Sequence, residues 1–310
     1  MSQDTKLYSN YLQVGKPVAS TTNRDHEPQA DASKRDAGAA ANPGAENGMD
    51  ALNKKTMNAA ARSCYAGARG LKDAEAAALA MIAAEVRDQP LLDLGFGGGR
   101  TIEPLLEVSK DYIGLDYAQE MVAVSRSLFP GVDLRHGDAR DLSQFEDNTF
   151  AMVVFSCEGI CMVDHGGRMA ILAEVLRVLR PDGIFLFSTM NQNSDYHTRG
   201  YQFPDFKMSL NPARLTVRSA RFTRRTASRL VNRLRYRKRD MRGEEFSIIN
   251  DVYHNYSTMI YYISLANQRK QLEAVGFQSH ATALDLKGEV IEGDSIDNTL
   301  TLIARKPLPG

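Results

Sequence analysis

This sequence of 310 residues has no long apolar run, few cysteines and a formal net charge of zero. No stretch of 18 or more apolar residues occurs, so we expect no transmembrane helix. The first residues, MSQDTKLYSNYLQ, contain no apolar core behind a basic start, which argues against a secretory signal. Together these absences predict a cytoplasmic protein.

The three cysteines, Cys64, Cys157 and Cys161, are too few for a disulfide framework or a zinc site. Cys157 and Cys161 lie four residues apart beside an apolar segment, and we expect both to be small buried thiols. No carboxylate cluster stands out either, so the sequence predicts no metal centre.

Positive and negative side chains balance over the whole chain, with 38 of each. They do not balance locally, because the segment 214–242 contains twelve Lys or Arg against one acid, Asp240. Its apolar residues fall near one face of a helix: Leu215, Phe222, Leu230 and Leu234. This basic helix is either a solvated surface or a docking site. The docking partner would be an acidic carrier protein, an anionic ligand, RNA or an anionic membrane surface.

The chain divides near residue 51. Residues 19–50 are rich in Ala, Asn, Asp, Gly, Pro, Ser and Thr and have almost no large apolar side chain. Such a segment buries too little surface to offset the entropy of ordering it, so we expect residues 1–50 to be a disordered tail. We assign residues 51–310 to one domain.

Short apolar runs alternate with amphipathic segments through this domain. They predict strands at 90–94, 111–116, 132–136, 149–156 and 184–190, and helices between them at 98–108, 118–128 and 166–179. Further helices are expected at 52–64, 72–88 and 267–277, and closing strands at 277–286 and 298–306. The alternation predicts a doubly wound α/β fold, with a mostly parallel sheet and helices on both faces.

The first of these strands is followed by a turn with four glycines in five positions, in LLDLGFGGGR (residues 91–100). Open parallel sheets bind ligands beyond the carboxyl ends of their strands. A glycine-rich turn at that edge lets backbone N–H groups approach a ligand with no Cβ in the way. We therefore expect a nucleotide-like ligand at this turn.

Two of the three nucleotide-binding patterns fit the turn poorly. A P-loop needs a lysine followed by Ser or Thr, whereas this sequence has Arg100 and Thr101. A dinucleotide fingerprint would need a third glycine where Arg100 stands. The pattern acid-x-Gly-x-Gly-x-Gly fits throughout, at Asp93, Gly95, Gly97 and Gly99.

In this last pattern the sequence resembles the class I S-adenosylmethionine-dependent methyltransferases. The resemblance continues in order with GLDYA around Asp116, HGDARDL around Asp138, NTFAMVVFSCEGI at the fourth strand and LRVLRPDGIFLFS at the fifth. Four motifs in order are more specific than any one alone. The resemblance implies a seven-stranded, Rossmann-like methyltransferase sheet and a helical substrate lid in the insertion 191–262.

The resemblance also implies S-adenosylmethionine as the cofactor and suggests how its methionine end is held. The backbone of Gly95, Gly97 and Gly99 would contact the methionine moiety. Asp93 would orient the ammonium group through hydrogen bonds or water, and Tyr65 would close over this end.

The same resemblance suggests roles at the adenosine end. Asp116 would accept hydrogen bonds from both ribose hydroxyls, as carboxylates do in other nucleotide folds. Tyr117 would lie against the adenine, and Asp138 would accept from the adenine amino group beside the Ala139 backbone. The floor beneath the methyl group would be formed by Phe155 and Ser156.

A catalytic residue is harder to infer, because the sulfonium supplies both electrophile and leaving group. A general base is needed only when the acceptor enters protonated. After the fourth strand, SCEGI replaces the Asn/Asp-Pro-Pro box of amide and exocyclic-amine methylases. Cys157 also lacks the adjacent proline of cytosine C5 methylases.

His254 is our candidate for a general base, since it lies in a tyrosine-rich segment that could wall an aromatic pocket. His197, His165 and Glu158 remain alternatives. The sequence also looks like a bacterial group of small-molecule methyltransferases tied to specialised metabolism. Members of that group tend to carry a histidine before the asparagine that follows the fifth strand, where this chain has Met190.

The sequence thus predicts transfer of a methyl group from S-adenosylmethionine to an oxygen or nitrogen of a small organic molecule. One alternative is an RNA methyltransferase that uses the basic helix 214–242 on phosphates. Another is a non-catalytic binding subunit with the same fold, and a more distant one is a NAD-dependent oxidoreductase.

Overall fold

The computed structural model describes residues 48–60, 69–198, 201–206 and 208–310. The predicted disordered tail lies outside these ranges except for its last three residues, and so do Tyr65 and Cys64. Residues 49 and 50, which we placed in the tail, begin helix α2 (Met49–Ala60).

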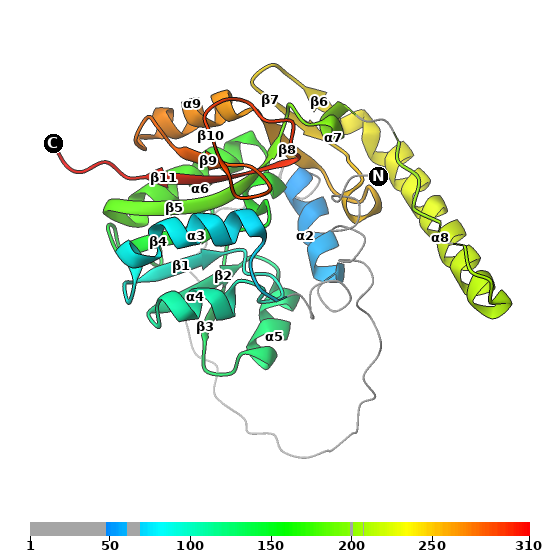
Figure 1. The fold of residues 1–310 in the computed structure, drawn as a ribbon, viewed down its shortest axis with the longest axis horizontal. Helices are drawn as coiled ribbons and strands as arrows, with labels where there is room; N and C mark the ends of the chain where they lie inside the picture. Colours follow the sequence, from blue (N-terminus) through cyan, green and yellow to red (C-terminus); the bar gives the residue numbers. More distant parts are fainter. Residues whose placement is uncertain (1–47, 61–68, 199–200, 207) are drawn as a thin grey trace, which may run out of the picture.

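One mixed sheet runs through the described part of the molecule (Figure 1). Its parallel strands lie in the order β3 (Asp133–His136), β2 (Tyr112–Asp116), β1 (Leu91–Leu94), β4 (Phe150–Phe155) and β5 (Leu179–Asn191). Strand β11 (Thr299–Arg305) pairs antiparallel with β5, and β9 (Thr282–Leu284) pairs antiparallel with β11. These seven strands confirm the predicted doubly wound, mostly parallel, Rossmann-like sheet. A short strand, β10 (Val290–Ile291), extends it beyond β9.

Helices cover both faces of this sheet (Figure 1). Helices α3 (Asp73–Val86), α4 (Ile102–Val108) and α5 (Gln119–Leu128) pack on one face, and α6 (His165–Val178) and α9 (Leu265–Val275) on the other. Neighbouring residues of β1 show this directly, because Leu91 belongs to the core under α3 and α4 whereas Leu92 belongs to the core under α6 and α9. Burial on both faces explains why these strands read as continuous apolar runs.

Local signals set the ends of several helices. Asp164 caps α6 by accepting a hydrogen bond from the Gly167 N–H (2.8 Å). Gly276, with a φ of 115°, ends α9 in the left-handed conformation that glycine tolerates. Helix α4 begins at Ile102 and not at the predicted residue 98, because the left-handed backbone of Gly99 precedes it.

The insertion 191–262 is α-helical only up to Tyr236. It contains α7 (Asp195–Thr198) and the long helix α8 (Pro212–Tyr236), which confirms the predicted basic helix. The remainder forms β6 (Met241–Arg242), β7 (Phe246–Ile249) and β8 (Ile260–Ile263), with a 3-10 turn at Tyr253–Asn255 between the last two. Strand β8 extends the sheet by pairing in parallel with the end of β5, since its IYYI run is buried throughout and favours strand structure. Among the helices of the described ranges, none is both long and apolar enough to cross a bilayer.

Candidate active site

A cavity of about 360 Å³ lies at the carboxyl ends of β1, β2, β3 and β4. This is the edge where open parallel sheets bind ligands. The cavity is lined by most of the residues that the sequence pointed to: Gly95, Gly97, Asp116, Tyr117, Asp138, Ala139, Phe155, Ser156 and His254. The fold therefore brings together residues that lie up to 159 positions apart in the chain.

The loop after β1 needs glycine for two physical reasons. Gly95, Gly97 and Gly99 have φ values of 65°, 55° and 83°, a region that other residues rarely adopt. Packing adds a second constraint, because a Cβ on Gly99 would lie 2.3 Å from the Phe129 ring and one on Gly95 would lie 2.7 Å from the Phe155 ring. A Cβ on Gly97 would meet only the Gly95 oxygen, at 3.9 Å, so the middle of the loop is open. Gly99 itself does not line the cavity.

Asp116, at the end of β2, fastens the loop to the sheet. Its Oδ2 accepts a hydrogen bond from the Gly97 N–H and its Oδ1 accepts one from the Ala118 N–H, both at 2.8 Å. Burial raises the pKa of this carboxyl to about 6. Each carboxylate oxygen can accept more than one hydrogen bond, so Asp116 retains the capacity to accept from a ligand in the cavity.

Asp138 lies beyond β3 and is held by an arginine that also reaches helix α2. Arg140 donates from Nε and from its guanidinium end to Asp138, at 3.0 and 2.6 Å, and forms a short ion pair with Asp50. Burial alone would raise the pKa of Asp138, but the hydrogen bonds from Arg140 lower it below its usual range. Helix α2 thereby closes this end of the cavity, where Met57 lines the wall.

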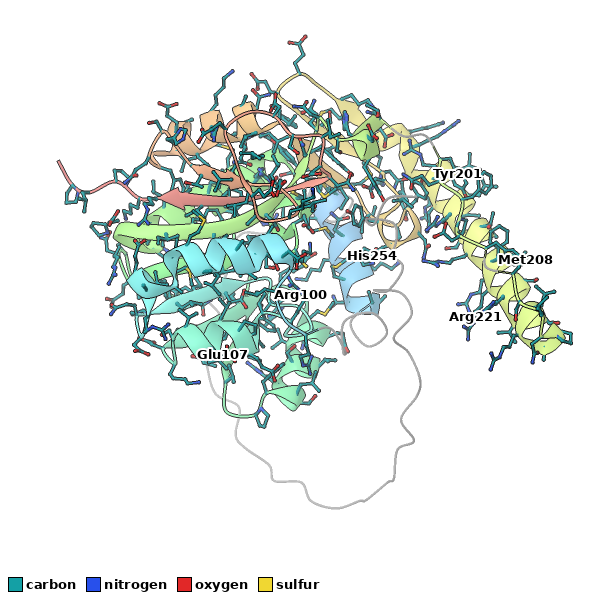
Figure 2. The ribbon with its side chains drawn as sticks, viewed as in Figure 1. Arg100, Glu107, Tyr201, Met208, Arg221 and His254 are labelled. Carbon is teal, nitrogen blue, oxygen red and sulfur yellow. The ribbon has the colours of Figure 1, made fainter. Side chains whose placement is uncertain are left out.

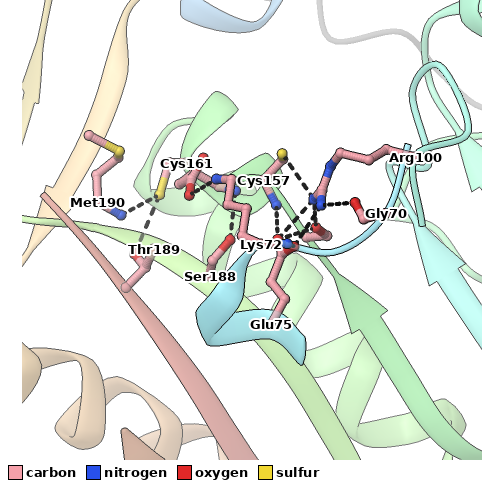
Figure 3. A network of polar contacts seen from close by, with 11 residues as sticks. Gly70, Lys72, Glu75, Arg100, Cys157, Cys161, Ser188, Thr189 and Met190 are labelled. Carbon is pink, nitrogen blue, oxygen red and sulfur yellow. Dashed lines mark hydrogen bonds and ion pairs between the residues drawn. The ribbon is translucent and has the colours of Figure 1, made fainter. Parts of the chain in front are cut away.

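A buried polar network joins helix α3 to the glycine loop after β1 and to the end of β4 (Figure 3). Arg100 forms an ion pair with Glu75 (2.7 Å) and donates to the Ser156 hydroxyl (2.6 Å) and to the Cys157 sulfur (3.2 Å). Burial alone would raise the pKa of Glu75, but the charge of Arg100 lowers it to about 2. Nearby, Lys72 lines the cavity and forms an ion pair with Glu158 (2.8 Å).

The network corrects two expectations from the sequence. In the sequence, Arg100 counts only against a P-loop and a dinucleotide fingerprint, whereas the structure shows that it pairs with Glu75 of α3 beside the cavity. Cys157 is exposed, so our prediction of a buried thiol is wrong there, whereas Cys161 is buried as predicted. The left-handed φ of 52° at Cys157 turns the chain outward at the end of β4.

The wall opposite the loop comes from the insertion. Residues 252–255 line it, within a segment where His254, Asn255 and Tyr256 have φ values of 47°, 58° and 60°. Three consecutive non-glycine residues in the left-handed region store backbone strain, which is typical of functional sites. Burial lowers the pKa of His254 to about 4, so its imidazole is neutral near pH 7.

The alternatives to His254 are distributed differently. Glu158 lines the cavity, paired with Lys72. His165 lies outside the lining, with Nδ1 2.9 Å from the Tyr261 hydroxyl and its ring stacked on Phe246. His197 also lies outside it, beside Arg242. In the part of the chain that the structure covers, no three His, Cys, Asp or Glu side chains converge as a metal site requires.

Comparison with known proteins identifies the fold and its family. Residues 91–183 match the family model described as a methyltransferase domain. The chain carries a class I S-adenosylmethionine-dependent methyltransferase domain. Its matched region holds the glycine loop and the acids of β2 and β3 described above. The cofactor of this domain is S-adenosylmethionine.

Two curated relatives share this methyltransferase domain. A probable S-adenosylmethionine-dependent methyltransferase of Mycolicibacterium smegmatis is 35% identical over 103 residues, which are 33% of this chain and 38% of the relative. The phthiotriol/phenolphthiotriol dimycocerosates methyltransferase of Mycobacterium tuberculosis is 37% identical over 108 residues, which are 33% of this chain and 37% of the relative. The chain thus spans less than two fifths of the length of these relatives.

A solved structure extends the likeness beyond the matched region. It is the 1,6-didemethyltoxoflavin-N1-methyltransferase of Burkholderia thailandensis, 14% identical, with a TM-score of 0.51. The likeness covers 88% of this chain and 93% of that one. At this identity it establishes a shared methyltransferase fold.

Asp93 occupies a position in this methyltransferase domain that the sequence did not indicate. It is fully buried below the loop, outside the cavity lining, and accepts hydrogen bonds from the Thr101 hydroxyl (2.6 Å) and the Tyr112 hydroxyl (2.9 Å). Burial raises its pKa to about 7. This position favours support of the loop, and the predicted contact with the ammonium group remains a prediction.

The raised pKa of Asp93 predicts a pH-dependent stability. A carboxyl whose folded pKa of about 7 exceeds its unfolded value of 3.8 contributes stability that is complete below pH 3.8 and is lost as the pH rises through 7. The Asp93→Asn variant cannot ionise, so its free energy of unfolding relative to wild type should increase between pH 5 and pH 8. Urea denaturation at both pH values measures the difference. Parallel pH profiles for the two proteins would contradict the assignment.

Proposed function

We propose that this chain transfers a methyl group from S-adenosylmethionine to an oxygen or nitrogen of a small, largely apolar organic molecule. The observation that carries the proposal is one continuous cavity, which joins the glycine loop and strand-end acids to an apolar chamber beneath the insertion. The M. tuberculosis relative and the B. thailandensis structure are each named after an organic molecule that they methylate. Their names support this class of substrate.

The residues of the adenosine end suit the cofactor. Asp116 retains acceptor capacity for the ribose hydroxyls, and Asp138 with the Ala139 backbone suits an adenine edge. Tyr117 lines the cavity, while its hydroxyl is buried and has no hydrogen-bond partner within the described residues. We propose that Lys72, which the sequence did not indicate, faces the carboxylate of the methionine end.

When bound, S-adenosylmethionine supplies an electrophilic methyl group on a sulfonium. The protein's own contribution is to orient the acceptor in line with that methyl group and to exclude water. Phe155 packs against the loop below this point, and Met190 lies at the end of β5 beside it.

The cavity is rich in methionine along its length, with Met57 and Met121 beside Tyr117 at the adenosine end and Met190 at the end of β5. Four methionines line the cavity, namely Met57, Met121, Met162 and Met190. Their flexible, polarizable side chains adapt to apolar ligands of irregular shape. Tyr196, Phe203 and Ile260 add further apolar surface, so the chamber suits an acceptor with a ring or hydrocarbon body.

We propose His254 as the general base that accepts the proton of a hydroxyl or ammonium acceptor. Its imidazole is unprotonated at pH 7 because burial lowers its pKa to about 4, and the same burial makes it a weaker base than a solvated histidine. The His254→Ala variant should lose about 100-fold or more in kcat. Protonation of His254 should lower kcat/KM only below about pH 5, so kcat/KM should not depend on this residue's titration at higher pH.

The matched control is His280→Ala, because His280 is exposed and does not line the cavity. This control should retain wild-type kcat, and both variants should bind S-adenosylhomocysteine like the wild type in calorimetry. If His254→Ala keeps full kcat while Glu158→Gln loses it, Glu158 is the base instead.

The function itself is tested with methyl-labelled S-adenosylmethionine. The protein is incubated with an extract of its source cells, and labelled products are separated into small molecules, RNA and protein. We expect label in a small organic product together with release of S-adenosylhomocysteine. Label confined to RNA or protein, or no calorimetric binding of S-adenosylhomocysteine, would overturn the proposal.

A further inference from the structure

Helix α8 extends away from the rest of the molecule (Figure 1). With 25 residues it is about 37 Å long. Its carboxyl-terminal part is fastened to the body, where Arg229 donates to Asn255 (3.1 Å) and to the Gln202 carbonyl (2.9 Å) and Arg233 forms an ion pair with Asp240 (2.9 Å). The remainder is a projecting arm.

The outer face of this arm is apolar and exposed. Six exposed residues recur at spacings of three, four or seven, which places them on one helical face: Ala213, Val217, Ala220, Ala227, Val231 and Leu234. Leu230 lies at the edge of this stripe. The exposed fractions are 51% for Val217, 62% for Val231 and 54% for Leu234. Folding therefore leaves an apolar stripe along the arm in contact with water.

Exposed arginines lie along one side of the stripe, and Arg224 interrupts it between Ala220 and Ala227. Helix α8 contains eight arginines and no acidic residue, and the exposed ones are Arg214, Arg218, Arg221, Arg224 and Arg235. Figure 2 shows Arg221 projecting from the arm into open space, whereas His254 lies within the body. The segment beside the arm adds exposed apolar side chains at Phe203 and Met208.

This combination discriminates among possible partners. A second copy of the chain would bring two helices with eight arginines each, and no acid on either, into contact along the stripe, so like charges would repel. Phosphate groups of RNA would satisfy the arginines but leave the apolar stripe unexplained. An anionic lipid surface satisfies both, because headgroups pair with arginine while the apolar face enters the acyl boundary.

We propose that α8 docks this protein on an anionic lipid membrane, with the apolar stripe inserted at the interface and the neighbouring arginines on the headgroups. The base of the arm also walls the cavity, through Arg225 and Arg229. Arg225 and Arg229 lie on the side of the helix opposite the stripe, so the helix stands between the cavity and the docked surface. Lipid binding is therefore independent of the proposed function.

Co-sedimentation of the full-length protein with lipid vesicles tests the docking. One set of vesicles is phosphatidylcholine alone, and the other contains equal parts of phosphatidylcholine and phosphatidylglycerol. We expect at least about 10-fold tighter binding to the anionic vesicles, weakened by salt. The variant Val217→Ser/Val231→Ser/Leu234→Ser and the variant Arg221→Glu/Arg224→Glu should each weaken that binding by about 10-fold or more.

Matched controls carry the same changes on exposed positions elsewhere. Met81→Ser is the apolar control, since Met81 is 51% exposed on α3, and Arg87→Glu/Lys110→Glu is the charge control. Both controls should bind anionic vesicles like the wild type. Every protein should also bind S-adenosylhomocysteine equally in calorimetry, which separates failure of docking from failure of the proposed function.

Three results would overturn the docking. The first is an absence of binding to anionic vesicles. The second is binding that neither arm variant weakens. The third is the absence of vesicle binding together with evidence for another partner. That evidence would be a dimer that the Val217→Ser/Val231→Ser/Leu234→Ser variant dissociates, or binding to polyuridylate that only the Arg221→Glu/Arg224→Glu variant weakens.

Discussion

Replacing Asp116 by alanine should weaken the binding of S-adenosylhomocysteine by about 100-fold or more. In the proposed site this carboxylate accepts from two ribose hydroxyls, and hydrogen bonds to a charged group contribute about 1.5–3 kcal/mol each. The substitution also removes the acceptor of the Gly97 and Ala118 N–H groups, so the loop loses its fastening to β2. Isothermal titration calorimetry measures the dissociation constant directly.

Asp133→Ala is the control for this experiment, because Asp133 is an exposed aspartate at the start of the neighbouring strand and pairs with Arg135. It should leave the affinity unchanged. The pKa of Asp116 is raised by burial, so alanine there relieves a buried charge and the variant should remain folded. An unchanged dissociation constant for a folded Asp116→Ala variant would disprove the placement of the ribose.

Replacing Arg168 by alanine should lower the free energy of unfolding by about 3–5 kcal/mol. Arg168 is fully buried in α6, where its guanidinium donates to the Ile160 carbonyl (3.1 Å) and the Thr189 hydroxyl (3.0 Å). It also donates to Gln268 and Gln271 of α9. Alanine would leave these acceptors unsatisfied and open a cavity between the sheet and two helices.

Urea denaturation measures this loss, and Arg87→Ala on the exposed surface should change stability by no more than about 0.5 kcal/mol. Arg168 does not line the cavity, so the folded variant should bind S-adenosylhomocysteine with wild-type affinity. A loss below about 1 kcal/mol would show that the buried guanidinium is dispensable for the fold.

The positions of the main strands along the chain were predictable because each is a short apolar run bounded by turn residues. Strand β1 was expected at 90–94 and spans Leu91–Leu94, and β2 was expected at 111–116 and spans Tyr112–Asp116. Helix α4 was predicted four residues too long, because periodicity does not reveal the positive φ of the preceding glycines. The β-structure at 241–263 was missed because its strands are short and gain stability by pairing with β5 and with one another.

The strand-end side of the cavity was largely predictable, since its residues directly follow parallel strands whose ends meet at one edge. The contributions of Met57, Lys72, Glu75 and Arg140 were not. Those side chains reach the site or its supporting network from α2, from the start of α3 and from a loop, and their positions depend on how these elements pack. At the start of α3 the Lys72 N–H donates to the Glu75 carboxylate (2.8 Å), a local contact that does not set the direction of the helix in space.

Taken alone, the order of residues determined the strand and helix pattern outside residues 241–263, the family and the basic amphipathic character of residues 214–242, because each is encoded by local spacing. Only the tertiary structure decided that Asp93 lies below the loop, that His254 reaches the cavity while His165 does not, and that α8 leaves its apolar stripe exposed. These outcomes depend on which surfaces distant segments bury against one another, and such long-range choices are not visible in any short stretch of sequence.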